Sequence, residues 1–269
     1  MSKSIAIMGC GWLGLPLAKS LVDEGYTVHG STTSEEKLPI LEKEGVQPFL
    51  ISLSEEGPKG PVLHFLQDVD SIIINIPPRL RGGNRENYIK KIRGLYNAVK
   101  ASSIQKIVFV SSTSVYGDID GEVTEDTLPN PSTESGRQLL ATEDIFRNDH
   151  QLHTTVVRFG GLIGPNRHPV TMLSGRTGLV NGAAPINLIH LDDCIAILKS
   201  IVTQGWWNEV FNAVYPDHPP KAEYYSMEAR KRGIPVPDYS EDSDQKGKKV
   251  MSSSLILVKK YHFNTSIYN

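Results

Sequence analysis

The stretch that decides the fold is Ile5-Ala6-Ile7-Met8-Gly9-Cys10-Gly11-Trp12-Leu13-Gly14. Four apolar residues typical of a buried strand lead into the spacing Gly-x-Gly-x-x-Gly, and residues 12–24 then have helical periodicity. In that spacing Gly9 permits a tight turn, Gly11 lets the backbone approach a pyrophosphate, and Gly14 lets helix and strand pack closely. The helix start offers free N–H groups and a partial positive charge. The sequence therefore predicts a dinucleotide-binding turn, with contacts from Gly9, Cys10, Gly11, Trp12, Leu13 and Gly14.

Strand-like and helix-like segments alternate as far as residue 159. We expect strands at 26–29, 47–51, 71–76, 106–110 and 154–159, and helices at 34–44, 87–101 and 135–148. Residues 71–76 are apolar except at their ends, as in a strand that is buried on both faces. This rhythm predicts an α/β protein with a Rossmann-type doubly wound parallel sheet.

The rhythm loosens after residue 159. Residues 160–184 are rich in Gly and Pro and indicate a loop, whereas 187–190 indicate a short strand, and 192–202 and 219–232 indicate helices. Residues 240–249 are polar and indicate an exposed loop. We therefore expect residues 1–165 to form an NAD(P)-binding Rossmann domain. Residues 166–269 would form a smaller C-terminal substrate lobe, interleaved with the sheet near 185–203.

Composition narrows the setting. The chain has 269 residues, 39% of them hydrophobic and 22% charged, which allows a sizeable core. Its formal net charge of -2 comes from mixed charges, so no nucleic-acid partner is indicated. Cys10 and Cys194 have neither metal-ligand nor disulfide-framework spacing, which favours a reducing compartment. We expect a cytoplasmic protein with no leader peptide, metal site or membrane partner, and a homodimer is compatible with these features.

The end of the second expected strand bears on which dinucleotide binds. An Asp or Glu there would bind the ribose 2′-hydroxyl and repel a 2′-phosphate. After this strand the chain instead has the hydroxyl groups of Ser31, Thr32 and Thr33 with Lys37 close behind, and the first carboxylate after the strand is Glu35. The pattern favours NADP over NAD, and the alternative is a polar turn that only caps the next helix. The residues that we expect to contact the cofactor here are Ser31, Thr32, Thr33 and Lys37.

After the fifth expected strand comes Ser111-Ser112-Thr113-Ser114-Val115-Tyr116-Gly117. This segment resembles the extended short-chain dehydrogenases/reductases, which include nucleotide-sugar epimerases and dehydratases. Residues 158–165 resemble that family's segment beside the nicotinamide, and residues 187–193 resemble a late motif of the same family. The resemblance implies that Ser112 is the catalytic serine that hydrogen-bonds the reacting oxygen. It also implies cofactor contacts from Ser111, Phe159 and Gly160. Asn75 and Pro77 lie at the end of the fourth expected strand, at the ligand edge of the sheet, where we expect them to contact the adenosine or nicotinamide ribose side of the cofactor.

The chain departs from this family at its main acid/base. The family uses a Tyr with a Lys four residues later, and alignment on Gly136 places Ser135 and Leu139 at these positions. Tyr96 and Lys100 have the right spacing, but their helix should run away from the ligand edge of the sheet. The pattern resembles the atypical branch of the family that lacks the Tyr/Lys pair. Tyr116 is the nearest remaining tyrosine and a candidate substitute, although a packing role is the alternative.

Other residues bear on a substrate. Arg79 and Arg81 follow the fourth expected strand, where they would clamp a phosphate or carboxylate or simply be solvated. Ser135 and Asn187 are further substrate candidates through the resemblance. Two functions remain open at this point. One is an NAD(P)-dependent epimerase, dehydratase or reductase that acts on a sugar nucleotide or another anionic small molecule. The other is a non-catalytic NAD(P)H-binding sensor.

Overall fold

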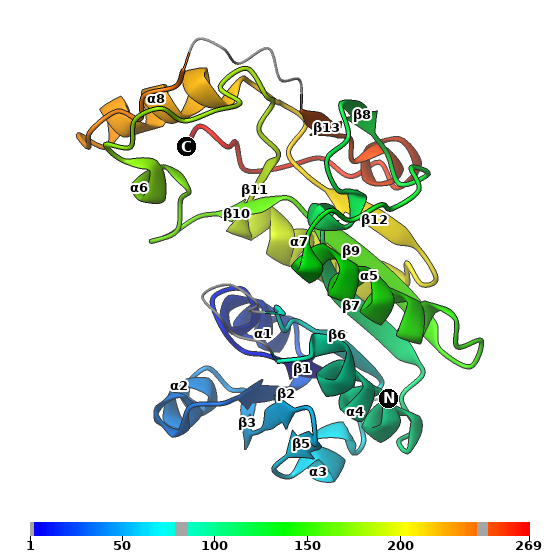
Figure 1. Ribbon diagram of the computed structural model, residues 1–269. Coiled ribbons are helices and arrows are strands. Elements are labelled where there is room, and N and C mark those ends of the chain that lie inside the picture. Colours follow the sequence, from blue (N-terminus) through cyan, green and yellow to red (C-terminus); the bar gives the residue numbers. More distant parts are fainter. Residues whose placement is uncertain (1–2, 79–85, 241–246) are drawn as a thin grey trace.

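The computed structural model describes residues 3–78, 86–240 and 247–269. Seven strands form one central sheet in the order β12-β9-β7-β6-β1-β2-β3, and every neighbouring pair is parallel (Figure 1). The strands are β1 (Ser4–Met8), β2 (Thr27–Thr32), β3 (Gln47–Leu50), β6 (Ser71–Ile74), β7 (Lys106–Ser112), β9 (His153–Phe159) and β12 (Val210–Ala213). The predicted doubly wound parallel sheet is confirmed.

Helices cover both faces of this sheet. The helices that contribute to the core on one face are α1 (Gly14–Asp23), α2 (Leu38–Lys43) and α7 (Leu191–Gln204). On the other face lie α3 (Val62–Leu66), α4 (Tyr88–Lys100) and α5 (Glu134–Arg147). The helix expected at 34–44 is divided into a 3₁₀ turn, η1 (Glu35–Lys37), and α2, because Pro39 sits in the first turn of the α-helix.

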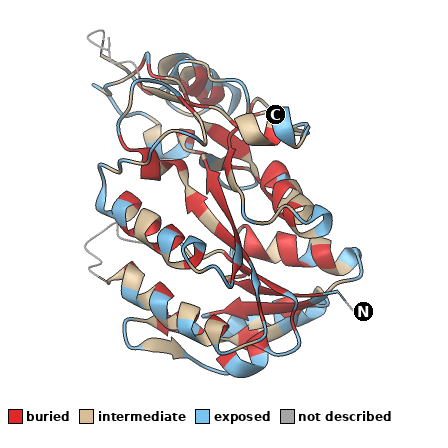
Figure 2. Ribbon diagram, turned by 90° about the vertical axis from the view of Figure 1, so that its right-hand side faces the viewer, coloured by how far each residue is buried: buried red, intermediate tan, exposed pale blue. Residues whose placement is uncertain are grey.

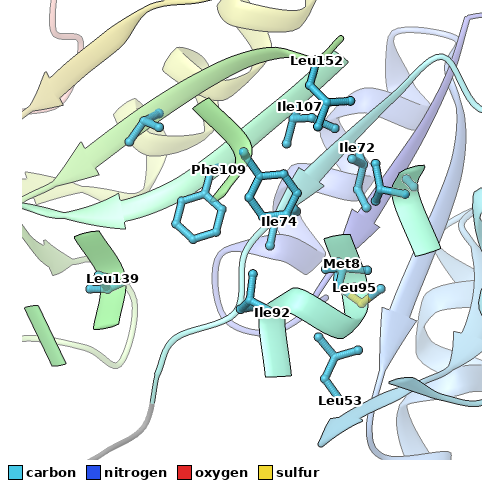
Figure 3. Packing of buried hydrophobic residues seen from close by; sticks show 14 of the residues in the cluster. Met8, Leu53, Ile72, Ile74, Ile92, Leu95, Ile107, Phe109, Leu139 and Leu152 are labelled. Atoms are coloured by element: carbon cyan, nitrogen blue, oxygen red, sulfur yellow. The ribbon is translucent and has the colours of Figure 1, made fainter. Parts of the chain in front are cut away.

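Alternation along the strands divides the apolar side chains between two cores. Residues of β1 and β6 are buried throughout, and Figure 2 shows the middle of the sheet in the buried colour. Successive side chains of a strand point to opposite faces, so Met8 and Ile72 pack toward α4 whereas Ile7 and Ile73 pack toward α1. Figure 3 shows the first of these cores, which also holds Ile74, Ile92, Leu95, Phe109 and Leu139.

Smaller elements complete the chain. A short antiparallel pair consists of β4 (Ser52–Ser54) and β5 (Gly57–Lys59), and a 3₁₀ turn, η2 (Thr113–Tyr116), follows β7. The other elements are β8 (Gly121–Val123), β10 (Gly161–Ile163), α6 (Val170–Leu173), β11 (Leu188–His190), α8 (Lys221–Lys231), β13 (Lys248–Val250) and a π-helical turn, η3 (Ser254–Val258).

The C-terminal half does not divide at residue 165 as simply as expected. The segment 160–184 is not only loop, since it contains β10 and α6, and β10 pairs with β11 outside the central sheet. Residues 185–203 were expected to interleave with the sheet. Further along the chain, β12 also belongs to the central sheet and forms one of its edges. The lobe around α6 and α8 has its own core, which includes Ile163, Val170, Ile186, Leu188 and Tyr224. Within the described ranges, no helix has the length and apolar character that a membrane crossing requires.

Candidate functional site

The glycine turn lies between the carboxyl ends of β1 and β6. Neighbouring strands continue in opposite directions from this point, and ligands of open α/β sheets bind at such switch points. Gly9 has φ +107°, and a Cβ on it would lie 2.5 Å from the Asn75 carbonyl oxygen. A Cβ on Gly14 would lie 2.2 Å from the Gly9 carbonyl oxygen. Both positions therefore need glycine, as the motif predicts: Gly9 for the tight turn, and Gly14 for the close packing of helix against strand.

Gly11 differs from these two glycines because a Cβ added to it would meet no atom of the described residues within 4 Å. The space above Gly11 is therefore open. The backbone N–H groups of Trp12, Leu13 and Gly14 donate to no backbone carbonyl of the described chain. Free amides at a helix start beside an open glycine are suited to a pyrophosphate. The residues present thus fit the dinucleotide that the sequence predicts.

The neighbouring side chains hold this turn in shape. Ser31 Oγ accepts a hydrogen bond from the Gly9 amide at 2.9 Å, and the Asn75 amide donates to the Gly9 carbonyl at 3.1 Å. The Cys10 amide donates to the Ser31 carbonyl at 2.8 Å. Burial raises the pKa of the Cys10 thiol to about 12. The Cys10 thiol donates to the Ile7 carbonyl at 3.8 Å, so both the thiol and the amide of Cys10 have partners within the protein. Ser31 and Asn75 act as positioning residues.

Two further residues of the motif differ in what they expose. The Leu13 side chain is 3% exposed and packs in the core, so only its backbone can meet a cofactor. Trp12 is half-buried, and its Nε1 donates to the Pro165 carbonyl at 3.1 Å. The Arg167 guanidinium lies 4.8 Å from the centre of the Trp12 ring. These contacts join the glycine turn to Pro165, at the end of the segment 158–165 that the resemblance places beside the nicotinamide, and to Arg167 just beyond it.

A pocket of about 320 Å³ lies between the glycine turn and α2. Gly11, Trp12 and Lys37 line it together with Cys10, Leu15, Ile40 and Leu41. Lys37 and Thr33 are exposed, whereas Thr32 is buried and its Oγ1 accepts a hydrogen bond from the Ser34 amide at 3.2 Å. The structure thus brings Lys37 to the turn, whereas Thr32, at 6% exposure, is buried away from a cofactor.

The segment after β7 separates its two predicted serines. Ser112 is half-buried at the carboxyl end of β7, and its Oγ accepts a hydrogen bond from the Ser114 amide at 3.1 Å. Ser111 is buried and donates to Glu143 Oε1 at 2.5 Å. Ser112 therefore lies at the ligand edge of the sheet. The Ser111 side chain belongs to the core, and this corrects its assignment as a side-chain contact of the cofactor.

Tyr116 does not have the environment of an acid/base. It is 0% exposed, and its hydroxyl donates to Asn212 Oδ1 at 2.8 Å and accepts from Arg158 Nη1 at 2.9 Å. Arg158 is also buried and forms an ion pair with Glu143 at 2.6 Å. Burial raises the pKa of Tyr116, which is the opposite of what proton transfer near neutral pH needs. The packing alternative is the one that the structure supports.

The positions that the family gives to Tyr and Lys lie on α5. Ser135 is half-buried in its first turn, whereas Leu139 is 4% exposed and packs in the core on the α4 side (Figure 3). Tyr96 and Lys100 both contact Asp149, at 2.8 and 2.7 Å, in the segment before β9. That segment is at the opposite edge of the sheet from the glycine turn, as expected. Tyr96 and Lys100 therefore lie outside the site.

Several other residues that were predicted to contact the cofactor or substrate instead pack or form hydrogen bonds within the protein. Phe159 is 2% exposed in the core, and a Cβ on Gly160 would lie 2.6 Å from the Asn187 carbonyl oxygen. Asn187 donates to the Lys248 carbonyl at 2.8 Å and accepts from the Val250 amide at 2.7 Å. Its amide group therefore anchors β13 and is not free for a substrate. Pro77 is exposed after β6, and Arg79 and Arg81 lie outside the described residues.

One residue near Ser112 was missed by the sequence analysis. The Lys248 ammonium group donates to the carbonyl oxygens of Thr113 at 3.0 Å and Gly117 at 2.7 Å, at the two ends of η2. Lys248 is half-buried, and burial lowers its pKa. It lies 135 positions from Thr113 in the chain. Its segment looks like a polar loop, so no local signal in the sequence could have identified it.

An open glycine turn at the switch point of a parallel sheet defines a dinucleotide-binding α/β protein. Residues 9–186 match the family model described as NAD(P)H-binding, and the chain belongs to this family. Protein YeeZ of Escherichia coli K12 is 34% identical to it over 255 residues, which cover 94% of this chain and 93% of that protein. Low-salt glycan biosynthesis protein Agl12 of Haloferax volcanii is 29% identical over 134 residues, 44% of this chain and 43% of Agl12.

Solved structures share the fold at lower identity. UDP-glucuronic acid 4-epimerase from Bacillus cereus, in complex with NAD, has a TM-score of 0.80 at 20% identity, covering 98% of this chain and 92% of that one. MoeE5 in complex with UDP-glucose and NAD has a TM-score of 0.75 at 19% identity, covering 99% and 95%. The epimerase/dehydratase-like fold is therefore established. The family and these NAD-bound neighbours support a nicotinamide cofactor.

Proposed function

We propose that this protein is an NADP-preferring enzyme of the epimerase/dehydratase type that acts on a sugar nucleotide or another anionic small molecule. The observation that carries the cofactor preference is the pocket shared by Gly11, Trp12 and Lys37. A phosphate on the adenosine ribose would find a lysine there, and no carboxylate lines the pocket. The bound nicotinamide would supply hydride transfer, and the residues of the chain would bind the cofactor and the substrate and orient them toward each other.

Ser112 supports catalysis in this proposal. Its hydroxyl lies at the same edge of the sheet as the glycine turn and can donate to a substrate oxygen while it accepts from the Ser114 amide. Two of the solved relatives are named with UDP sugars, which motivates the substrate class. The second candidate is a non-catalytic NAD(P)H sensor. The burial of Tyr116 favours it, because that hydroxyl is not available for proton transfer. Leu139, at the position of the family's Lys, has no titratable group.

The test begins by titrating the purified protein with NADPH and, separately, with NADH. Fluorescence of the reduced nicotinamide reports the binding of each. We expect both to bind, and NADPH to bind more tightly. Replacement of Lys37 by Gln should weaken NADPH about tenfold and NADH less than twofold, as expected for the loss of one charge-assisted contact. Lys43→Gln is the matched control, because Lys43 is also an exposed lysine, at the end of α2, but does not line the pocket. Equal losses for NADPH and NADH would remove the basis for the NADP preference.

Turnover separates the two candidate functions. NADPH and NADP⁺ would be incubated with a panel of sugar nucleotides and carbonyl compounds, and products would be followed by absorbance and mass spectrometry. Turnover that falls at least tenfold in Ser112→Ala, with unchanged cofactor binding, would establish the enzyme. Cofactor binding without turnover by any substrate would favour the sensor, and absence of cofactor binding would refute both.

A further inference from the structure

A short turn from the C-terminal half packs on the tryptophan of the glycine motif. This turn comprises residues 164–167, and the backbone groups of Gly164 and Arg167 form two mutual hydrogen bonds of 3.0 Å. A Cβ on Gly164 would lie 3.2 Å from Trp12 Cζ2. The Trp12 indole donates to the Pro165 carbonyl at 3.1 Å. The turn therefore lies directly against the Trp12 ring.

The same turn is anchored on its other side by the C-terminal lobe. His168, the residue after Arg167, is 7% exposed. Its Nε2 lies 3.1 Å from the hydroxyl of Tyr224, which belongs to the core of that lobe. The Trp12 ring and the lobe core thus fix the backbone before and after Arg167. Because its backbone is already ordered, Arg167 would lose less conformational entropy on binding a ligand than an arginine of a mobile loop.

A cation lies over the Trp12 ring. The Arg167 guanidinium is 4.8 Å from the ring centre, within the range of a cation–π contact. A contact of this kind satisfies none of the N–H donors of the guanidinium, which match the paired oxygens of a phosphate. Arg167 is exposed. Trp12 follows Gly11 and lines the pocket that also contains Lys37, so Arg167 lies at the border of the cofactor space.

A dinucleotide brings more negative charge to this space than the glycine turn offsets. Each phosphate of the pyrophosphate is negative, and NADP carries a further phosphate on its 2′-oxygen. The start of a helix supplies only about half a positive charge. Lys37 adds a cation from the segment before α2, and Arg167 is placed to add another from the side of the C-terminal lobe.

We propose that Arg167, held over the Trp12 ring, binds a phosphate group of the dinucleotide. The inference rests on the cofactor binding of the proposed function, and it names a residue outside the glycine motif. The pyrophosphate and the 2′-phosphate of NADP offer the same oxygens to the paired N–H groups of a guanidinium. Because His168 anchors the turn in the lobe, this contact would also join the bound cofactor to the C-terminal lobe.

The experiment compares wild type with Arg167→Gln by isothermal titration with NADH and NADPH. We expect about tenfold weaker binding in Arg167→Gln, as for the loss of a charge-assisted contact, and an unchanged Tm because the side chain is exposed. Equal losses for NADH and NADPH would assign the contact to the pyrophosphate, and a loss for NADPH alone would assign it to the 2′-phosphate. Arg176→Gln, at an exposed arginine farther along the same segment, is the matched control and should change neither affinity.

A double-mutant cycle with Trp12→Leu tests the role of the ring. Without the ring the guanidinium is no longer held in place, so Arg167→Gln should then weaken binding less than about threefold. Arg167→Lys keeps the charge but cannot form the paired bonds, and it should restore only part of the affinity. Unchanged affinities in Arg167→Gln would overturn the inference, and so would an equally large loss with and without the ring.

Two cofactor fragments distinguish failure of this inference from failure of the proposed function. ADP carries the diphosphate and 2′,5′-ADP carries the 2′-phosphate, and both lack nicotinamide. Binding of a fragment without binding of NADH or NADPH would refute the proposed function, while weaker binding of that fragment in Arg167→Gln would still support the phosphate contact. Absence of binding by all four compounds would overturn both.

Discussion

A methyl group added at Gly11 and one added at Gly14 should have opposite consequences. A Cβ on Gly14 would lie 2.2 Å from the Gly9 carbonyl oxygen and 3.2 Å from Asn75 Nδ2. The first contact is with backbone, so the helix or the strand must shift. Overpacking of this kind costs about 1–3 kcal/mol. At roughly 2–4 °C for each kcal/mol in a chain of this size, we expect Gly14→Ala to lower Tm by several degrees.

Gly11→Ala should leave the fold intact. Among the residues that the structure describes, the added methyl group meets no atom within 4 Å, and Gly11 is not among the glycines with positive φ. Its methyl group would instead project into the space where we place the pyrophosphate. We expect Tm within about 1 °C of wild type and cofactor affinity at least about tenfold weaker, equivalent to about 1.4 kcal/mol.

Differential scanning fluorimetry and an NADPH titration measure both effects on the same samples. The comparison is internal, because both variants add one methyl group within the same turn. Unchanged NADPH affinity in Gly11→Ala, with a normal Tm, would show that the pyrophosphate does not approach Gly11. A Tm loss as large as that of Gly14→Ala would show that the turn is closed, and the reasoning from open space would be wrong.

Three other predictions concern buried groups. Tyr116→Phe should lower the free energy of unfolding by about 1–3 kcal/mol in urea titrations, because Arg158 loses an acceptor, and NADPH affinity should not change; a loss of turnover at unchanged stability would instead make Tyr116 catalytic. Leu139→Lys should destabilise by about 3 kcal/mol or more and restore no activity, since the ammonium group enters the core; a stable, more active variant would contradict this. Burial lowers the pKa of His168 from 6.5 to about 4, so the folded ring stays neutral while the unfolded one takes up a proton. The wild type should therefore lose stability as pH falls from about 6.5 to 4, and His168→Gln should lose less; parallel pH profiles would exclude His168 as the cause.

The sequence by itself determined the sheet and the cofactor turn. Period-2 and period-3.6 patterns report which side of a local element is buried, so the central-sheet strands and the helices α1, α2, α4 and α5 up to residue 159 could be predicted within a few residues. The short elements β4, β5, α3 and β8 were not predicted. The roles of Gly9 and Gly14 are also local, because a tight turn between a strand and a helix leaves no room for a Cβ. The placement of Tyr96 and Lys100 away from the site followed from the direction of parallel strands.

Only the tertiary structure decided which polar side chains are free to act. Tyr116 and Ser111 are in a motif that resembles a catalytic segment, yet partners distant in the chain, Asn212 and Glu143, occupy their hydroxyls. Lys248 reaches the turn after Ser112 from a segment that has no local signal. The sequence shows the same serine, tyrosine or lysine whether its hydroxyl or ammonium group faces solvent, a ligand or a buried carboxylate. Its chemistry depends on long-range packing, which fixes both its partners and its degree of desolvation.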